Sequence, residues 1–322
     1  MTQGQLPSVW LIILNWNQSN ITLDCLASVL KSDYTNYHIV VIDNGSTDNS
    51  VQSIHSRFPS VNTIENESNL GVAVANNMGI RFALSNGAQY VCLLNNDTVI
   101  APDMLSLLIQ VAESHPKIAA TGPKMYFFDE PEKIWCAGGT IDWKMGSIHK
   151  GNGEFDRGNE SYPEPVAFIP SCALCIKAEA FKSIGLMDER WFIYYDDTDW
   201  CTRAVNKGWQ IFYTPQAKLW HRVSAAMKIA SPATDYYMTR NIFLFLYRNF
   251  KGVYLWRALS YALYGNTRTI VAYFIMPQKR HLVRNRTARL LAIRDMVLGR
   301  WGEMGPDVRK VCYPSESITK KA

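Results

Sequence analysis

Short apolar runs that end in polar residues constrain this chain more than any other feature. The runs 9–14 (VWLIIL), 38–43 (HIVVID) and 90–94 (YVCLL) are rich in β-branched residues and too short for helices, which predicts buried strands. Between them, residues 22–31 and 72–85 carry apolar residues at helical spacing. Strands that alternate with helices predict an α/β fold, in which a mostly parallel sheet is covered by helices on both faces.

The same patterns predict elements further along the chain. Helices are expected at 50–58, 179–184 and 198–207, and strands at 61–65, 167–178 and 209–213. Residues 126–165 are rich in Gly, Trp and charge and show little periodicity, which indicates a long functional loop or a small hairpin that could serve as a mobile lid. Beyond residue 231 the composition shifts to aromatic and Arg-rich helices. We therefore expect one domain over 1–230 and a helical region over 231–322.

Cysteine usage and the N-terminus bear on the compartment. Seven cysteines run from Cys25 to Cys312, mostly in apolar surroundings, and this odd count indicates buried thiols in a reducing compartment. Cys172 and Cys175 have the spacing of a metal or redox pair, but no second pair or nearby His completes a site. The N-terminus lacks the basic flank and apolar run of a signal peptide. We expect a cytoplasmic protein.

The net charge of +5 is unevenly distributed. No acidic residue falls between Asp235 and Asp295, whereas basic residues recur there. Residues 242–276 are apolar and aromatic but interrupted by Arg and Lys, so we expect no spanning helix. Amphipathic helices on an anionic membrane surface, at the inner face of the cell membrane, are one interpretation. The other interpretation is that these helices pack on the catalytic core or on a second subunit of a homo-oligomer. We expect no nucleic-acid partner, because no recognition motif accompanies the basic residues.

Polar clusters follow three of the predicted strands. These are residues 15–17 (NWN), 43–48 (DNGSTD) and 95–97 (NND), and in parallel sheets ligands bind at this carboxyl edge. Asp43 could accept a hydrogen bond from a pyrimidine imide, and Asp97 suits Mg²⁺ or Mn²⁺, which prefer oxygen ligands. Any one cluster could instead be a helix cap or a turn. Three clusters on one edge favour a binding site.

An acidic cluster, Asp196, Asp197 and Asp199, follows the aromatic run 191–195. Carboxylates this close repel one another, which raises the pKa of at least one, and an apolar wall raises it further. A carboxylate tuned in this way is a better proton acceptor near neutral pH. The alternative is that these acids begin a helix and complement its dipole.

The order of these motifs resembles that of glycosyltransferase family 2, which has the GT-A fold. The motifs are Asn15-Trp16-Asn17, residues 43–48, Asn69-Leu70-Gly71, Asn77-Met78-Gly79, residues 94–98, Asp196-Asp197 and His221. The resemblance covers about residues 7 to 250 and looks closest to bacterial rhamnosyltransferases and their galactofuranosyltransferase relatives. It implies a nucleotide-binding half at about 7–125 and an acceptor half at about 126–230.

The resemblance also implies roles for individual residues. Asp197 matches the catalytic base, and Asp97 with His221 matches the site of a divalent cation, Mg²⁺ or Mn²⁺, although Asn95 replaces the first acid of the metal motif. The residues expected to contact the nucleotide sugar are Asn15, Asn17, Asp43, Asn69, Gly71, Asn77 and Asn96. Those expected on the acceptor side or in secondary roles are Asp196, Asp199, Trp191 and Cys172, the last in place of a Gly.

The implied activity is inverting transfer of L-rhamnose from dTDP-L-rhamnose. The acceptor would be a saccharide, or a saccharide on a polyprenyl diphosphate, in cell-surface polysaccharide or O-antigen synthesis. Two alternatives stay open: a UDP-galactofuranose or other UDP-hexose transferase, and a non-catalytic binding subunit of a polysaccharide assembly complex. The first strand ends in NWN and not in GxGxxG, which counts against a dinucleotide oxidoreductase.

Overall fold

The structure, a computed structural model, describes residues 6–142, 146–223 and 231–314. The chain divides into two compact units. The first, which we call the sheet unit, comprises Met1–Ile141, Ser147–Asp188 and Asp196–Val223. The second, the helical unit, comprises Asp142–Gly146, Glu189–Tyr195 and Ser224–Ala322.

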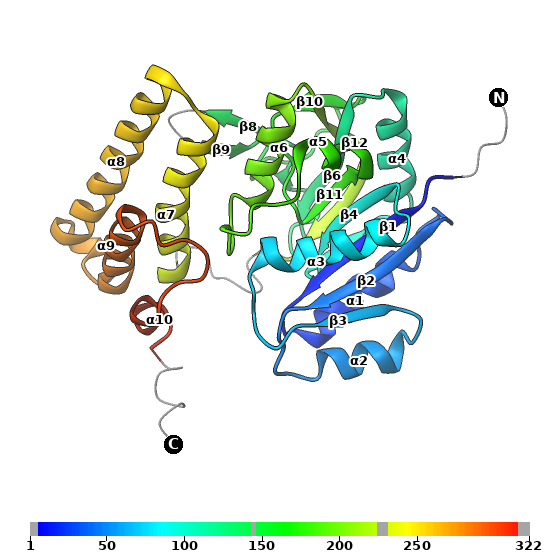
Figure 1. Cartoon of the computed structure of the whole chain (residues 1–322), viewed down its shortest axis with the longest axis horizontal. Helices are drawn as coiled ribbons and strands as arrows, with labels where there is room; N and C mark the ends of the chain where they lie inside the picture. Colours follow the sequence, from blue (N-terminus) through cyan, green and yellow to red (C-terminus); the bar gives the residue numbers. More distant parts are fainter. Residues whose placement is uncertain (1–5, 143–145, 224–230, 315–322) are drawn as a thin grey trace. The chain divides into compact units, whose positions relative to one another are not determined.

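The sheet unit alternates strands and helices over its first half and then becomes richer in strands (Figure 1). Its strands are β1 (Val9–Asn15), β2 (Tyr37–Asp43), β3 (Asn62–Glu65), β4 (Tyr90–Asn95), β5 (Thr98–Ile100), β6 (Ile118–Phe127), β7 (Ile134–Cys136), β10 (Glu164–Val166), β11 (Ala173–Lys177) and β12 (Gln210–His221). Its helices are α1 (Ser19–Val29), α2 (Ser50–Arg57), α3 (Val72–Ser85), α4 (Met104–Ser114), α5 (Ala178–Ile184) and α6 (Asp196–Asn206). Strands β8 (Gly139–Asp142) and β9 (Gly146–His149) form a separate two-stranded sheet.

The main sheet has the strand order β10-β12-β6-β11-β4-β1-β2-β3, with β5 paired to β12 and β7 to β6. Strand β1 lies between β2 and β4 and is parallel to both, and β3 continues the parallel arrangement beyond β2. Strand β11 then runs antiparallel to both β4 and β6. The predicted α/β class is confirmed: β4, β1, β2 and β3 form a continuous parallel run, and β6 and β12 form a further parallel pair.

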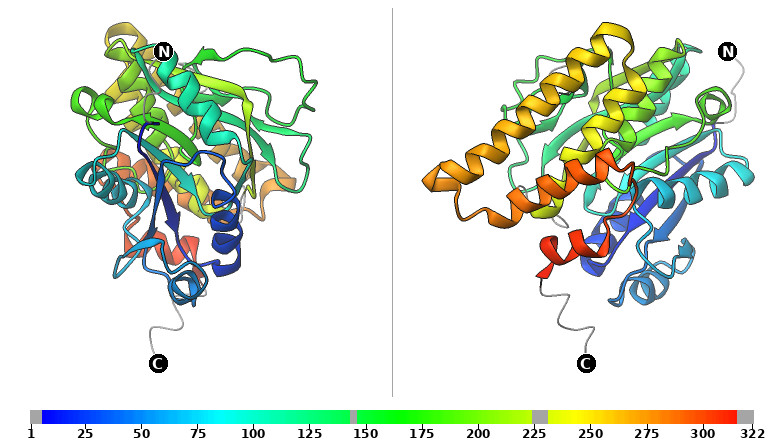
Figure 2. Two further views of the ribbon diagram at one scale, coloured as in Figure 1. Left: turned by 90° about the vertical axis from the view of Figure 1, so that its right-hand side faces the viewer. Right: turned by 60° about the vertical axis from the view of Figure 1, so that its left-hand side comes forward.

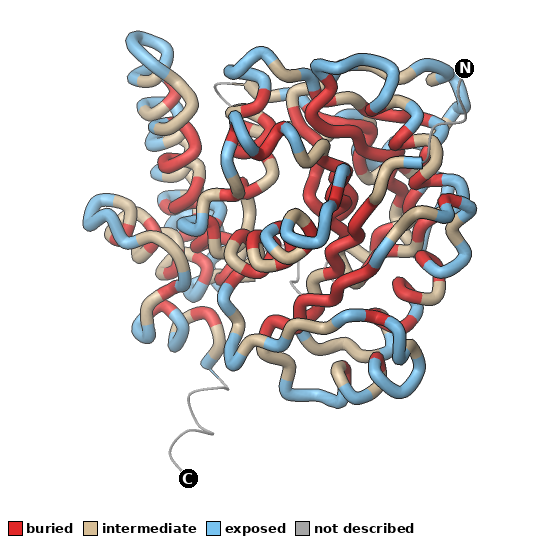
Figure 3. Tube along the Cα trace, turned by 45° about the vertical axis from the view of Figure 1, so that its right-hand side comes forward, coloured by how far each residue is buried: buried red, intermediate tan, exposed pale blue. Residues whose placement is uncertain are grey.

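Helices cover both faces of the sheet. Leu11, Cys92, Cys175 and Thr121 lie on one face, because each pairs with the next in register. On that face the Thr121 hydroxyl donates to the carbonyl of Leu108 in α4 (3.2 Å). On the other face a Cβ added to Gly79 of α3 would lie 2.4 Å from the Ile12 side chain, so only glycine permits this close approach. Burial on both faces explains why residues 9–14 are continuously apolar (Figure 3).

A buried lysine anchors the aperiodic stretch at 126–165. Lys124 of β6 is 2% exposed, and its Nζ lies 3.0 Å from Asp156 and 3.3 Å from Glu160. The hydroxyl of Tyr126 also donates to Asp156 (2.6 Å), and that of Tyr213 to Glu160 (2.6 Å). Removing either partner would leave a buried charge unpaired, so the ion pairs of Lys124 with Asp156 and Glu160 hold this stretch on the sheet.

The helical unit contains four α-helices within its described residues. They are α7 (Pro232–Asn249), α8 (Gly252–Ile275), α9 (Val283–Val297) and α10 (Pro306–Cys312), with a short 3₁₀ turn at Pro277–Lys279. Helices α7, α8 and α9 lie side by side (Figure 2). The Ser231 side chain caps α7 by accepting from the amide of Thr234 (3.1 Å). No helix in the described ranges is long and apolar enough to cross a membrane.

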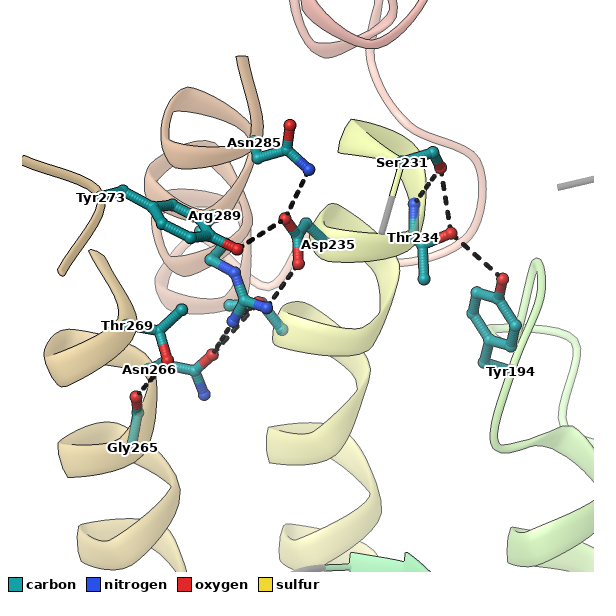
Figure 4. Close-up of polar contacts among 11 residues, drawn as sticks. Tyr194, Ser231, Thr234, Asp235, Gly265, Asn266, Thr269, Tyr273, Asn285 and Arg289 are labelled. Atoms are coloured by element: carbon teal, nitrogen blue, oxygen red, sulfur yellow. Dashed lines mark hydrogen bonds and ion pairs between the residues drawn. The ribbon is translucent and has the colours of Figure 1, made fainter. Parts of the chain in front are cut away.

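A buried polar network joins the three long helices (Figure 4). Asp235 of α7 forms an ion pair with Arg289 of α9 and accepts from Asn285 (2.8 Å). Arg289 also donates to Asn266 of α8 (3.0 Å), which in turn accepts from Thr239 of α7 (3.1 Å). Because the Asp235 carboxylate is 6% exposed, these partners compensate for its loss of hydration.

The Lys124 cluster yields a stability prediction. Replacing Lys124 by Met leaves Asp156 and Glu160 without their shared cation, so we expect the free energy of unfolding to fall by about 2 kcal/mol. Urea unfolding measures this change. Lys133→Met is the matched control, because the Lys133–Glu130 pair is partly exposed, at 28% and 57%, and should cost less than about 1 kcal/mol. Equal losses in the two variants would contradict the anchoring role.

Candidate active site

The carboxyl ends of β1 and β2 meet in a hydrogen-bonded pair. Asn15 and Asp43 are register partners, and Asn15 Nδ2 donates to Asp43 Oδ1 (2.6 Å). Ser46 adds two bonds to the same carboxylate, from its hydroxyl (2.5 Å) and from its amide (2.9 Å). The Ser46 hydroxyl also accepts from the Asn17 amide (2.7 Å). Three of the residues predicted to contact the nucleotide thus lie together on one edge of the sheet.

A second group of predicted residues is assembled by Asn44. Its Nδ2 donates to Asn69 Oδ1 (3.0 Å), and that oxygen also accepts from the Gly71 amide (2.9 Å). The loop that follows β2 requires glycine at position 45, where φ is +75° and a Cβ would lie 2.6 Å from the Ser68 backbone. Asn44 is 2% exposed, so it organises the loop from within.

Asn96 joins the first group, whereas Asn77 does not. Asn96 Nδ2 donates to the Thr22 hydroxyl (2.8 Å) and to Asn15 Oδ1 (3.3 Å). The Asn77 amide instead bonds both backbone groups of Met187, at 2.9 and 3.0 Å. Asn77 therefore joins α3 to the segment after α5, which is a packing role.

Asp97 and His221 form the candidate cation site. His221 Nε2 lies 3.1 Å from Asp97 Oδ1, and both residues are at least nine-tenths buried. Neither Asp97 Oδ1 nor His221 Nδ1 has a hydrogen-bond partner, so the 3.1 Å contact is too poorly aligned to satisfy the carboxylate. Buried polar atoms without partners are costly unless a ligand completes them.

This pair fits a divalent cation. A carboxylate oxygen and an imidazole nitrogen are ligands that Mn²⁺ accepts, and Mg²⁺ takes the oxygen. Among the described residues no group of three or more His, Cys, Asp or Glu side chains gathers as a metal site. The chain would thus supply two ligands and leave the remaining positions to phosphate oxygens and water.

Asp196 and Asp197 begin α6 and are both held by Ser171. The Ser171 amide donates to Asp197 Oδ2 (2.9 Å), and its hydroxyl lies 3.3 Å from Asp196 Oδ2. Asp197 is partly exposed, whereas Asp196 is 3% exposed. Burial, with the charge of Asp197 added, raises the pKa of Asp196 to about 8. Of the two, Asp197 is the carboxylate that can meet an incoming hydroxyl.

Cys172 connects the cation pair with the acidic pair. Burial raises the pKa of its thiol well above the ordinary value, and the charges of Asp97 and Asp197 raise it further. The Cys172 backbone carbonyl accepts from the amide of Asn95 at the end of β4 (3.2 Å). Ser171, whose amide binds Asp197, precedes Cys172 directly in the chain. Residues 171 and 172 thus link the end of β4, which leads into Asp97, with the acidic pair at the start of α6.

Two of the predicted secondary residues, Asp199 and Trp191, are buried. Asp199 is fully buried and binds Arg203 Nε (2.9 Å), and Arg203 also donates to the carbonyls of Ile184 and Leu186 (2.8 Å each). Arg203, paired with Asp199 within α6, thus fastens α6 to the end of α5. Trp191 is buried and belongs to the helical unit.

His149 and Trp135 belong to the site and were not predicted. The Trp135 ring packs edge-on against His221 (centroids 4.6 Å) and against His149 (4.8 Å). Burial lowers the pKa of His149, while Asp197 acts to raise it and His221 to lower it. Both residues come from the aperiodic stretch, where no sequence period marks one side chain as inward. The only available signal was that His and Trp are rare in ordinary loops.

The raised pKa of Asp196 predicts a pH dependence. The folded protein keeps a proton on Asp196 up to a pKa of about 8, whereas the unfolded chain loses it near 3.8. The free energy of unfolding should therefore fall as the pH rises through this window. Asp196→Asn removes the titration and keeps an acceptor for Ser171, so we expect a flatter profile and a higher stability than wild type at pH 8. Thermal unfolding across pH 5 to 8.5 tests this, and parallel profiles for the two proteins would refute it.

Solved structures share this architecture. A mannosyltransferase from Pyrobaculum calidifontis in complex with GDP-Man and Mn²⁺ matches with a TM-score of 0.56 at 15% identity, over 92% of this chain and 88% of that one. GalNAc-T7 with UDP, GalNAc and Mn²⁺ matches with a TM-score of 0.57 at 18% identity, over 67% and 44%. These likenesses confirm the GT-A fold.

Two rhamnosyltransferases are more similar to this chain in sequence than these structural neighbours are. The dTDP-rhamnosyl transferase RfbF of Shigella flexneri is 28% identical over 251 residues, which is 75% of this chain and 81% of the relative. The N-acetylglucosaminyl-diphospho-decaprenol L-rhamnosyltransferase of Mycobacterium tuberculosis is 27% identical over 216 residues, which is 61% and 70%. The family model for "Glycosyl transferase family 2" matches residues 10–185, more than half of the chain. The fold, the edge of polar residues and these matches agree, and the chain is a member of glycosyltransferase family 2.

Proposed function

We propose that this glycosyltransferase transfers L-rhamnose from dTDP-L-rhamnose, with inversion, to a saccharide or lipid-linked saccharide used in cell-surface polysaccharide synthesis. The observation that carries the proposal is the partly exposed Asp197 carboxylate, fixed by the Ser171 amide near the Asp97–His221 pair. The donor and the acceptor class are those in the names of the two rhamnosyltransferase relatives. We assign the catalytic domain to 1–230.

Asp197 acts as the general base. The Ser171 amide and the Thr198 hydroxyl (3.0 Å) hold its two oxygens in place, so the carboxylate needs little reorganisation to accept the acceptor's proton. The deprotonated oxygen attacks the anomeric carbon from the face opposite the nucleotide, which inverts the configuration. Asp196, buried and protonated near neutral pH, keeps a second negative charge out of the site.

The polar edge of the sheet binds the nucleotide. Asp43 is held by Asn15 and Ser46, and its carboxylate retains lone pairs for a pyrimidine imide. Asp97 and His221 would hold Mg²⁺ or Mn²⁺, which neutralises the diphosphate leaving group when bound. The manganese in two structural neighbours supports a divalent cation.

The outward face of α8 supports a membrane-surface role for residues 231–322. Its exposed positions, most of which recur at helical spacing, are Gly252, Val253, Tyr254, Trp256, Arg257, Ser260, Tyr261, Leu263, Tyr264, Thr267, Arg268, Val271, Phe274 and Ile275. Trp256 and Tyr264 are 70% and 64% exposed. Arg257 and Arg268 have no acidic partner among the described residues. Such a face suits the surface of an anionic bilayer, so we place the protein at the inner face of the cell membrane, where a polyprenyl-linked acceptor would be available.

The base assignment predicts a separation of binding from catalysis. Asp197→Asn should lower the rate of rhamnosyl transfer by at least about 100-fold, because the amide cannot accept the proton. The thermal shift induced by dTDP-L-rhamnose should persist, since bound donor stabilises the fold by mass action. Asp43→Ala should lose that shift. Near-normal transfer by Asp197→Asn would show that another group is the base, and a stronger shift with a UDP-hexose would reassign the donor.

The cation assignment predicts a change in metal dependence. His221→Ala should raise the Mn²⁺ concentration needed for half-maximal transfer by about tenfold or more, because one of two protein ligands is lost. His115→Ala, which changes an exposed imidazole, is the control. Full activity of the wild-type enzyme in excess EDTA would contradict a cation at this pair.

The membrane assignment predicts lipid binding through α8. Wild-type protein should co-sediment with vesicles of phosphatidylcholine and phosphatidylglycerol, and less with phosphatidylcholine alone. Changing Trp256 and Tyr264 together to Ser should weaken binding by about tenfold. The same double change at Phe155 and Tyr162, which are 63% and 84% exposed in the sheet unit, should leave binding intact. Equal effects, or no binding by the wild type, would argue against this surface.

A further inference from the structure

Two consecutive tyrosines adopt an unfavourable backbone conformation directly before the acidic pair. Tyr194 and Tyr195 have φ values of 65° and 70°. For a bulky residue this left-handed region is disfavoured, and it persists only where the surroundings enforce it. The next two residues in the chain are Asp196 and Asp197. The strained pair therefore sets the direction in which the chain enters α6.

One stripe of α7 follows this segment within the helical unit. The stripe consists of Thr234, Tyr237, Asn241 and Phe245, which helical spacing places on one face. Phe192 stacks on Tyr237 (centroids 5.4 Å), and Tyr195 lies against Phe245 (5.3 Å). The hydroxyl of Tyr194 lies 3.4 Å from Thr234 Oγ1, the contact drawn in Figure 4. The helix thus contacts the segment at successive positions up to the acidic pair.

Asn241 supplies the contact with the backbone itself. Its side chain is fully buried, and Nδ2 donates to the carbonyl of Ile193 (2.9 Å) and to that of Tyr194 (3.4 Å). Its Oδ1 accepts from Arg240 Nε (3.2 Å). Because both Nδ2 and Oδ1 are hydrogen-bonded, the side-chain amide has a single favourable orientation. The carbonyls that it binds are those that the left-handed turn directs toward α7.

Arg240 extends the support to the start of the segment. This fully buried guanidinium donates to the carbonyl of Gly302 (2.6 Å), and the Gly302 amide donates to the carbonyl of Arg190 (3.0 Å). The Arg240 side chain also lies against the rings of Tyr236 and Tyr237. Because Arg240 is itself fixed by these contacts, its hydrogen bond to Asn241 Oδ1 restrains the Asn241 side chain.

We propose that Asn241 is a positioning residue for transfer: it keeps Tyr194 and Tyr195 in the left-handed conformation and thereby fixes the start of α6, where Asp197 lies. The proposal rests on Asp197 being the base of the proposed function. Asn241 touches no reacting atom. Its effect passes through the backbone, so it should change the turnover rate more than donor binding.

Asn241→Ala is the first test. We expect kcat to fall by about 10- to 100-fold, since a small displacement of a catalytic group has effects of this size, while the KM for the donor changes by less than about threefold. Asn266→Ala is the control, because Asn266 is a hydrogen-bonded Asn of α8 in the same unit that does not contact the segment. A comparable loss of kcat in both variants would overturn the proposal.

Glycine rescue separates positioning from simple packing. In the Asn241→Ala background, Tyr194→Gly removes the backbone penalty of the left-handed turn, whereas Tyr194→Ala removes the same side chain and keeps that penalty. We expect kcat to recover at least about threefold with glycine and not with alanine. Equal behaviour of the two double variants would show that strain is not what Asn241 controls.

Amide hydrogen exchange gives a readout that does not depend on activity. Asn241→Ala should speed exchange over residues 190–197, and Asn266→Ala should not. If the wild-type protein transfers no sugar but this exchange pattern holds, the proposed function fails and the backbone restraint stands. If exchange over 190–197 is unchanged in Asn241→Ala, the restraint itself is wrong.

Discussion

The parallel register of β1 between β2 and β4 is the constraint on which the site depends. In this register β1 and β2 end side by side, at Asn15 and Asp43, and Leu14 of β1 lies beside Asn95 of β4. A slip of one residue would move each apolar side chain to the opposite face and separate these ends. Asn15 is fully buried at this point, and its side-chain amide donates to Asp43 and accepts from Thr22. The edge that we propose binds the nucleotide is thus a product of core packing.

The first half of the fold could be predicted because its strands are buried on both faces and alternate with helices. The direction of β11 could not be predicted, since the apolar pattern of residues 173–177 is compatible with a parallel or an antiparallel strand. Pairing antiparallel to β4 and β6 is decided by contacts distant in sequence. The stretch at 126–165 could not be predicted either, because its short strands and its ion pairs with the buried Lys124 follow no sequence period.

The site shows the same division. Strand ends identified Asn15, Asp43 and Asp97, since topology alone brings such ends together. Repulsion in the acidic cluster predicted a raised pKa, and the structure gives it to Asp196 because that carboxyl is buried. Sequence could not find Ser171, which reaches both acids from 25 and 26 residues away. Nor could spacing reveal that Asn77 and Asp199 are used for packing.

Each unit contributes differently to the candidate chemistry. The sheet unit holds the nucleotide edge, the cation pair and Asp197 itself. The helical unit holds the segment that leads into Asp197, by a stripe of α7 and a buried amide. Its helices are in turn joined by the Asp235 network. On the proposal above, Asn241 acts on Asp197 through the backbone of this segment.

The configuration of the product tests the central claim most directly. The wild-type enzyme would be supplied with a donor of known anomeric configuration, and the new linkage assigned by NMR. Direct displacement assisted by Asp197 predicts a product with the opposite anomeric configuration. A product with the donor's configuration would require a different mechanism and would contradict the role of Asp197 as a general base.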